Sequence, residues 1–188
     1  YEVDLPLLGR RQADNAAAAI RACELLVGDL DPGRVRRALR SIRLPGRQEV
    51  LKREPPLMVD VAHTEDSVRA LAATLQEIGA REVLLVFSPL ADKRLEEMAA
   101  LLAPVCREVI AAPARHPRAA ALGDVIRAFQ DHDVPVGQAL GIADAVDGAR
   151  ALAAEKAWVV VAGSFAAVAE ARAHVLGLSG ATSGKPPA

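Results

Sequence analysis

The chain has 188 residues, of which 52% are apolar and 25% are charged, a composition typical of a folded globular protein rather than a disordered one. Lysine and arginine together number 23 against 24 acidic residues, and the net charge of −1 excludes a global basic field that would gather nucleic acid or an anionic membrane. Aromatic residues make up only 3% of the chain, which argues against stacking platforms for bases. We therefore expect neither nucleic-acid nor membrane partners.

The two cysteines, Cys23 and Cys106, lie far apart and belong to no CxxC or Cys/His cluster, so neither a disulfide nor a zinc site is expected. Both are predicted to be small core residues in a reducing compartment. No apolar stretch approaches the roughly 20 residues of a membrane span, and no charged-then-apolar signal segment is found, which predicts a cytoplasmic protein. Because the first residue is Tyr1 rather than Met, we interpret the chain as a piece of something longer.

The first 44 residues are predicted to be helical. Residues 1–8 are expected to be extended, an Ala-rich helix follows over residues 12–27, and Asp31-Pro32 offers the N-cap and first-turn proline of a second helix that ends near Ser41. Leu44-Pro45-Gly46 then breaks the chain, and we place a domain boundary there. Residues 1–44 are therefore expected to pack as a partly orphaned appendage that belongs to a neighbouring domain.

From about residue 48, short apolar runs alternate with segments of helical period, which is the pattern of βαβ units. Apolar spacing predicts intervening helices, two of them Ala-rich, over residues 143–154 and 165–176. The fold class is α/β, with a Rossmann-like, mixed but mainly parallel sheet of about six strands and helices on both faces. Its strands are predicted at residues 48–52, 57–61, 83–87, 109–112, 134–140 and 158–162, with the continuous apolar runs 83–87 and 158–162 at the centre. A Gly-, Ser- and Pro-rich tail from residue 179 is expected to be disordered.

The loop that follows predicted strand 57–61 is the first candidate site, because ligands of open α/β sheets bind beyond the carboxyl ends of the strands. Asp60 and His63 lie there, three residues apart. An acid and an imidazole at a strand-to-helix junction can address a ribose hydroxyl, a metal-bound water or a substrate amine. On spacing alone, the ordinary interpretation is favoured, in which Asp60 and Thr64 only cap the following helix.

Three further residues are candidates at chain junctions. Arg47 directly follows the Pro-Gly break, where its guanidinium could hold a phosphate, although most arginines in such runs face solvent. Asn15 lies near the start of the first helix, at a potential polar-ligand site or simply in solvent. Ser164 follows the last predicted strand, at a ligand-binding position or as an ordinary N-cap. The sequence contains no phosphate loop of the Gly-x-x-x-x-Gly-Lys-Ser/Thr type.

Taken in order, these segments resemble the C-terminal part of the folylpolyglutamate synthase and dihydrofolate synthase family, within the Mur ligase superfamily. Residues 8–17 look like the family's Gly-x-His-Gln-x-x-Asn-Ala-Ala segment, with Arg11 in place of His. Residues 44–49 look like its Pro-Gly-Arg-x-Glu, and residues 60–65 like its Asp-Gly-Ala-His-Asn-Pro, with Thr64-Glu65 in place of Asn-Pro. Weaker signatures match at Asp92-Lys93, Pro117-Arg118-Ala119 and Gly163-Ser164. The order and spacing of the motifs make the resemblance specific.

The resemblance implies an ATP-dependent ligase that joins L-glutamate to dihydropteroate or to a folate through an acyl phosphate. It also implies that residues 1–44 end a central ATP-binding domain, that residues 45–178 form the C-terminal glutamate ligase domain, and that the phosphate loop and most Mg²⁺ ligands lie in the chain's own N-terminal ATPase domain, outside this sequence. This fragment alone is therefore expected to be inactive. By the same resemblance, ATP is contacted at positions 15, 47 and 60, a catalytic role falls to His63 and a substrate-binding role to Ser164, and no residue of this chain is assigned as a metal ligand.

A stand-alone Rossmann-like module without catalysis is the competing interpretation, in which the same loops bind a nucleotide or a partner. An encoding frame that continues upstream into a phosphate loop would favour the ligase, whereas a frame that begins at or just before Tyr1 would favour the module. The departures at Arg11 and Thr64-Glu65 are interpreted as lineage variation, because Arg47, Asp60 and His63 are all present.

Overall fold

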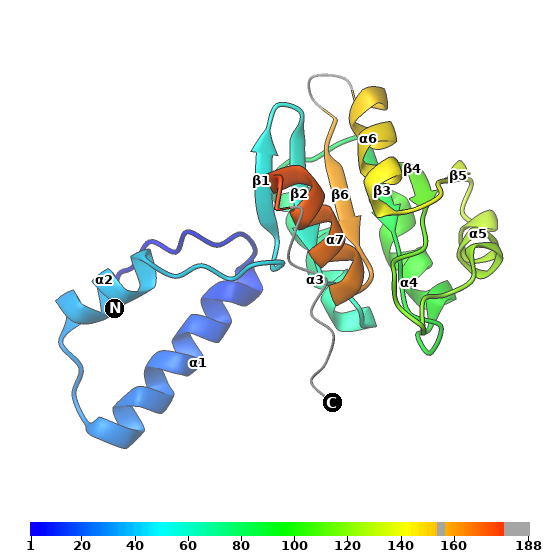
Figure 1. Cartoon of the computed structure of the whole chain (residues 1–188). Helices are drawn as coiled ribbons and strands as arrows, with labels where there is room; N and C mark the ends of the chain where they lie inside the picture. Colours follow the sequence, from blue (N-terminus) through cyan, green and yellow to red (C-terminus); the bar gives the residue numbers. More distant parts are fainter. Residues whose placement is uncertain (154–156, 179–188) are drawn as a thin grey trace, which may run out of the picture.

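The computed structural model describes residues 1–153 and 157–178, so the tail predicted to be disordered from residue 179 lies outside the described residues. The chain begins with two helices, α1 (Arg10–Val27) and α2 (Pro32–Arg40), which lie apart from the main body on the side of strand β1 (Figure 1). Asp31 caps α2 as predicted, because its carboxylate accepts the Arg34 N–H at 2.7 Å and a proline occupies the first helical position.

The body is a six-stranded mixed sheet in the order β1-β2-β6-β3-β4-β5, in which β1 is antiparallel to β2 and the other neighbours are parallel. The predicted fold class is thereby confirmed. The apolar strands β3 and β6 occupy the centre and are buried along their whole length, as expected of strands covered on both faces. The bounds are β1 (Glu49–Arg53), β2 (Pro56–Asp60), β3 (Val83–Phe87), β4 (Cys106–Ala111), β5 (Val136–Gln138) and β6 (Val159–Ala162).

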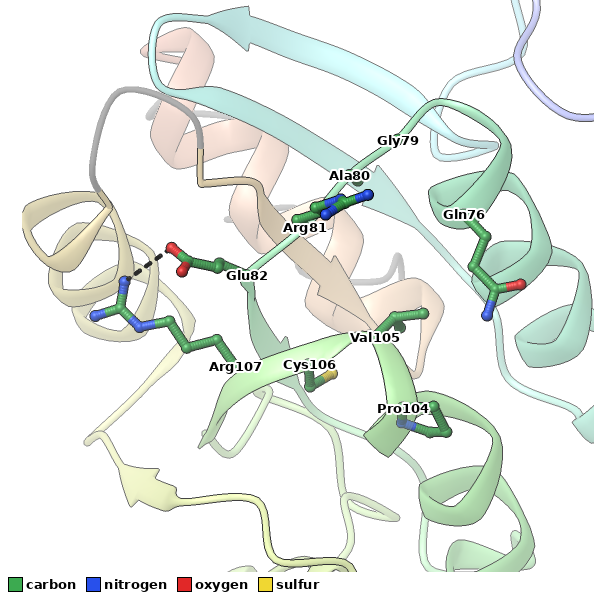
Figure 2. Close-up of a pocket in the computed structure, with 9 residues that line it drawn as sticks. All are labelled: Gln76, Gly79, Ala80, Arg81, Glu82, Pro104, Val105, Cys106 and Arg107. Atoms are coloured by element: carbon green, nitrogen blue, oxygen red, sulfur yellow. Dashed lines mark ion pairs between the residues drawn. The ribbon is translucent and has the colours of Figure 1, made fainter.

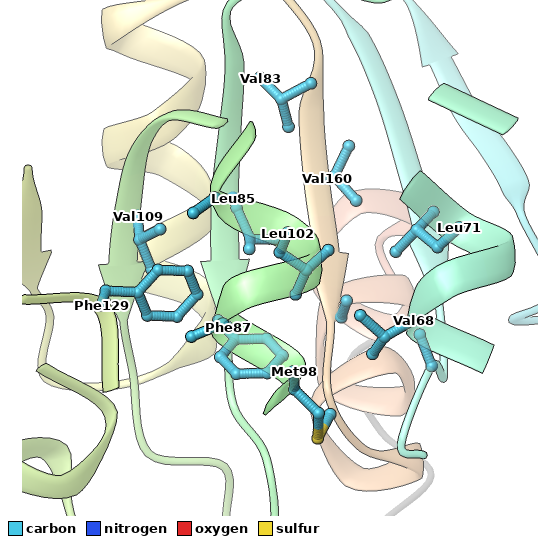
Figure 3. Close-up of a cluster of buried hydrophobic side chains, with 14 of the residues drawn as sticks. Val68, Leu71, Val83, Leu85, Phe87, Met98, Leu102, Val109, Phe129 and Val160 are labelled. Carbon is cyan, nitrogen blue, oxygen red and sulfur yellow. The ribbon is translucent and has the colours of Figure 1, made fainter. Parts of the chain in front are cut away.

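Helices cover both faces of this sheet, and the alternation of side chains along β3 divides the core in two. Val83, Leu85 and Phe87 point to one face, where they pack on α3 (Glu65–Glu77), α4 (Leu95–Leu102) and α5 (Leu122–Gln130) (Figure 3). Leu84 and Val86 point to the other face, which α6 (Ile142–Leu152) and α7 (Phe165–Leu176) cover. A short 3₁₀ turn, Ala103–Val105, links α4 to β4.

Helix α1 has no buried residue and α2 buries only Leu39, so residues 1–44 form the expected orphaned appendage. Polar contacts hold it together, among them the hydrogen bond from Tyr1 to Glu24 at 2.9 Å and the ion pair of Arg40 with Asp4 at 2.8 Å. The prediction that Cys23 is a core residue is wrong, because α1 carries it away from the sheet into solvent. Cys106 does pack against the core, and burial raises the pKa of its thiol to about 12.

Several strand ends differ from the sequence prediction, most of them by one residue, and β4 begins at Cys106, three residues before the expected start. Two further differences lie at the edge strands. The strand expected over residues 134–140 is shorter and covers only Val136–Gln138. It lies at the edge of the sheet, where it can pair with β4 alone, and it does so through three residues. Gln48, expected to open the first strand, lies before it in a turn conformation with φ of 47°. Both differences arise at the sheet margin, where hydrophobic pattern constrains pairing least.

The turn between β6 and α7 leaves no room for a side chain at Gly163, so we predict that adding one methyl group there destabilises the fold. Gly163 has a φ of 115°, and a Cβ there would lie 2.7 Å from the Ser88 carbonyl carbon. We expect Gly163→Ala to lower the free energy of unfolding in urea by about 2 kcal/mol or more, because strained backbone and steric overlap add. As a control, Gly148→Ala in α6, with open space around it, should instead raise that free energy by about 0.5–1 kcal/mol. Equal effects of the two substitutions would contradict this account.

Candidate functional site

The carboxyl ends of β2 and β6 lie at one edge of the sheet, and a short chain of backbone hydrogen bonds joins three loops there. The Val61 N–H donates to the Gly46 carbonyl at 2.9 Å, and the Gly163 N–H donates to the Val61 carbonyl at 3.2 Å. These bonds set side by side the turn before β1, the loop after β2 and the turn after β6. Each of the three carries a residue that the sequence had marked as a candidate.

The turn over residues 44–47 presents Arg47. Pro45 and Gly46, the latter with a φ of 72°, occupy its two central positions, and the Arg47 N–H closes it on the Leu44 carbonyl at 3.1 Å, as in a type II turn. The Gly46 N–H points outward and donates to the Glu49 carboxylate at 2.8 Å. The Pro-Gly pair therefore forms the tight turn that fixes the backbone position of Arg47.

Glu49 is held in turn by α7. The Arg172 guanidinium donates to both of its carboxylate oxygens, at 2.7 and 3.1 Å. Burial by itself would raise the pKa of Glu49, but the Arg172 hydrogen bonds, the Gly46 N–H and the Arg172 charge together lower it below its ordinary value. Glu49 thus stays ionised and ties the arginine turn to a helix 123 residues further along the chain.

Asp60 ends β2 and is only 5% exposed. Burial raises the pKa of its carboxyl group to about 6, although the Ala62 N–H, the Arg47 charge and a hydrogen bond from Gln48 act to lower it. The interpretation that Asp60 caps the next helix is wrong, because its Oδ1 accepts the Ala62 N–H at 3.1 Å. Thr64 is the cap of α3, in a reciprocal capping box with Ser67.

Asn15, Arg47 and Asp60 line one cleft of about 260 Å³ between α1 and the sheet edge. The start of α1 is seated closely there, since a Cβ on Gly9 would lie 2.4 Å from Gln48 Oε1. A guanidinium, a buried carboxyl group and an amide in one cleft suit a nucleotide, because the first can bind phosphate and the second can accept a ribose hydroxyl. The other lining residues are Leu8, Arg11, Gln12, Leu44, Gln48, Ser67 and Ala70.

Gln48 is a residue that the sequence analysis did not single out for this cleft. Gln48 is only 7% exposed, and its Oε1 has no hydrogen-bond partner within the described residues. A buried acceptor without a donor is costly, so a ligand donor or a bound water at this point would be favourable. The sequence offered no signal for it, because Gln48 sits at the variable position of its motif.

His63 is not among the residues that line this cleft, and its ring lies beside Phe165, the first residue of α7. Its ring centroid is 5.6 Å from that of Phe165. Burial, followed by the nearby charges of Lys93 and Arg47, lowers the pKa of His63 below its ordinary value of 6.5, so the imidazole is neutral at pH 7. Its Nδ1 is buried without a hydrogen-bond partner in the part of the chain that the structure describes.

Ser164 is the N-cap of α7, which was the ordinary interpretation of this residue from the sequence. It is 2% exposed, and its Oγ accepts the Ala167 N–H at 3.2 Å at the start of α7. Its role in substrate binding stays a prediction. Glu65, one of the two departures from the family pattern, turns to Arg94 at 2.8 Å and supports the start of α3.

A second pocket, of about 440 Å³, opens at the opposite edge of the sheet, where β3 and β4 begin (Figure 2). The ion pair of Arg107 with Glu82, at 3.8 Å, joins two of its lining residues. It holds none of the predicted site residues, and the thiol of Cys106 in its wall is a poor nucleophile because its pKa is raised. Its lining consists of Gln76, Gly79, Ala80, Arg81, Glu82, Pro104, Val105, Cys106 and Arg107.

Within residues 1–153 and 157–178, no group of three or more His, Cys, Asp or Glu side chains is placed to hold a metal ion. The described helices also include none that is long and apolar enough to cross a membrane.

Residues 46–165 match the protein family described as "Mur ligase, glutamate ligase domain". A "Probable bifunctional folylpolyglutamate synthase/dihydropteroate synthase" of Haloferax volcanii is 35% identical over 173 residues, which are 91% of this chain and 20% of that protein. The structure of Mycobacterium tuberculosis folylpolyglutamate synthase complexed with ADP superposes with a TM-score of 0.86 at 31% identity, over 91% of this chain and 41% of that one.

A bifunctional folylpolyglutamate synthase/dihydrofolate synthase, solved with Mn, AMPPNP and L-glutamate bound, is also similar, with a TM-score of 0.79 at 30% identity. The alignment covers 92% of this chain and 41% of that one. The chain thus spans between a fifth and two fifths of the length of these proteins.

The buried carboxyl of Asp60 predicts a pH-dependent gain of stability on its removal. Because its folded pKa of about 6 exceeds the ordinary 3.8, ionised Asp60 costs stability above pH 6, and the cost disappears below pH 4. Asp60→Asn should raise the free energy of unfolding at pH 7.5 by about 2 to 3 kcal/mol, each pKa unit being worth about 1.4 kcal/mol. Chemical denaturation of the 188-residue chain at pH 7.5 and pH 4 measures the difference.

The exposed Asp14 on α1 provides the control, since Asp14→Asn should leave stability the same at both pH values. An Asp60→Asn variant that is no more stable than the parent at pH 7.5 would show that the carboxylate is stabilised in the folded chain.

Proposed function

The chain belongs to the Mur ligase family as its glutamate ligase domain, and we propose that it is the C-terminal part of an ATP-dependent ligase that adds L-glutamate to dihydropteroate or to a folate. The observation that carries the proposal is the single cleft lined by Asn15, Arg47 and Asp60. The relatives named above support it, since one was solved with ADP and another with AMPPNP and L-glutamate.

In this proposal the cleft binds ATP. Asp60 accepts a hydrogen bond from a ribose hydroxyl, for which a carboxyl group held at the end of a buried strand is well placed. Arg47 presents its guanidinium to the phosphates, and Asn15 contacts the nucleotide from the first turns of α1. The unpartnered Oε1 of Gln48 in the same wall fits a ligand that donates a hydrogen bond.

The reaction then follows from charge and proton transfer. The acceptor carboxylate attacks the terminal phosphorus of ATP, which forms an acyl phosphate and releases ADP. The glutamate amine attacks the acyl carbon, and inorganic phosphate leaves. Arg47 stabilises the negative charge on the transferring phosphoryl group. His63, neutral because of its lowered pKa, takes the proton that the glutamate ammonium must lose before it can attack, while Ser164 contacts the amino acid.

Mg²⁺ would neutralise phosphate charge during transfer, and the described residues offer no cluster that could hold it. We therefore assign its ligands, together with the phosphate loop, to an N-terminal ATPase domain of the longer protein. Helix α1 fits this arrangement, because Leu25, Leu26 and Val27 at its end are 71%, 84% and 72% exposed. Exposed apolar side chains clustered at one helix end mark a surface that another part of a protein covers.

The 188-residue chain alone is expected to be catalytically inactive, because its sequence contains no phosphate loop. The backbone N–H groups of such a loop supply most of the binding to the phosphoryl group that is transferred. ATP turnover with glutamate and each acceptor, dihydropteroate and a folate, measures this. Appreciable turnover by the purified chain would contradict the division of labour proposed here.

In the longer protein, the site residues should affect different kinetic constants. Arg47→Ala should lower kcat about a hundredfold or more, because its charge acts as phosphoryl transfer proceeds. His63→Ala should lower kcat by about the same factor through loss of the base. Asp60→Ala should mainly raise the KM for ATP, about tenfold, since it removes one hydrogen bond to a neutral hydroxyl.

Arg127→Ala on α5 is the matched control, since this exposed arginine lies on a helix that does not line the cleft. Near-normal kinetics in all three site variants, with folding intact, would contradict these roles and show that the three residues are only caps and surface charge.

A further inference from the structure

Phe165 is an apolar residue that the fold leaves 62% exposed at the start of α7. Burial in the core therefore does not account for an aromatic residue here, but its ring lies close to two candidate site residues. The Cζ atom of Arg47 lies 5.4 Å from the ring centroid, and the imidazole of His63 lies 5.6 Å from it with the two planes tilted by 49°. No motif of the sequence pointed to a role for this residue.

One face of α7 grips the turn that carries Arg47. Phe165, Val168 and Arg172 recur at helical spacing, so they lie on the same side of the helix. Arg172 binds Glu49, which in turn holds the Gly46 N–H. Val168 closes on Gly46 so tightly that a Cβ there would lie 2.8 Å from Val168 Cγ1. These two contacts hold the backbone of the turn in place, and the Phe165 ring contacts the Arg47 side chain.

The chemistry of the contact matters for an arginine that must bind phosphate. A guanidinium within about 6 Å of an aromatic face is attracted to it. Contact with an aromatic ring, unlike an ion pair, leaves most of the guanidinium N–H donors free for an anion. A carboxylate partner would instead occupy those donors and neutralise the charge. Within the described residues, the guanidinium is held by this ring rather than by an ion pair.

We propose that Phe165 is a positioning residue of the ligase site, whose ring holds the Arg47 guanidinium ready for phosphate and shields the His63 imidazole from water. The inference rests on the proposed function and deepens it, because it explains how both side chains are placed before any substrate arrives. Preorganisation of this kind lowers the cost of ordering a long side chain in the transition state. Lys93 and Arg47 are the charged groups that face His63 beside this ring.

Three substitutions separate the ring from its bulk. Phe165→Tyr keeps an aromatic face, Phe165→Leu keeps an apolar side chain without one, and Phe165→Ala removes both. Leu140→Ala is the matched control, because Leu140 is another exposed apolar residue, 93% exposed, in the loop that follows β5 at the sheet edge opposite β1.

The first readout needs no activity and uses NMR of the 188-residue chain. The δ-methylene protons of Arg47 should show an aromatic ring-current shift that persists in Phe165→Tyr and is lost in Phe165→Leu. The pKa of His63 should rise toward its ordinary value in Phe165→Ala, since water then reaches the imidazole. An Arg47 shift that is absent from the parent chain, or unchanged in the Leu variant, would overturn the proposal.

The second readout is the kinetics of the longer protein. Phe165→Leu should lower kcat by about two- to fivefold, the factor that corresponds to a cation–π contact at an exposed site, while Phe165→Tyr and Leu140→Ala stay at the parent value. Equal losses in the Tyr and Leu variants, or a loss that tracks a fall in unfolding midpoint, would assign Phe165 a structural role and overturn the proposal. Failure of the proposed function is distinct, because the parent protein would then lack ligase activity while the NMR result still decides whether Phe165 holds Arg47.

Discussion

The ion pair between Glu49 and Arg172 is the contact on which the candidate site depends. Two hydrogen bonds join the side chains, and each side chain is about a quarter exposed, so the pair is screened less than an ion pair on the open surface. The same carboxylate takes the Gly46 N–H. One acidic residue thereby couples the last helix to the turn that aims Arg47, and the geometry of the cleft follows from that coupling.

Asp60 shows a tension between folding and function at the same edge of the sheet. The end of a buried strand is an unfavourable place for a carboxylate, and the raised pKa expresses that cost. Stability alone would favour a neutral residue here. A carboxyl group retained under such conditions, in a cleft with an arginine, is the arrangement expected of a functional residue rather than a structural one.

The appendage of residues 1–44 completes the cleft and adds little to the core, against which its Leu8 packs. Asn15 comes from α1, whose own side chains are not buried against the sheet, and the close seating of Gly9 against Gln48 holds the start of that helix at the site. The cleft therefore lies between this appendage and the end of the sheet that carries Asp60. Such a junction suits a ligand that both parts must touch.

The sequence by itself determined the approximate strand positions and the central place of β3 and β6, because continuous apolar runs act locally, and it named cleft residues through the family resemblance. Asp60, Arg47 and Asn15 could be named from their motifs. The tertiary structure alone decided that Asp60 does not share the cap of α3 with Thr64, that Cys23 faces solvent, and that Phe165 and Arg172 contact the residues of the Arg47 turn. These outcomes depend on which helix face meets which loop over separations of up to 123 residues, and local periodicity carries no information about such pairings.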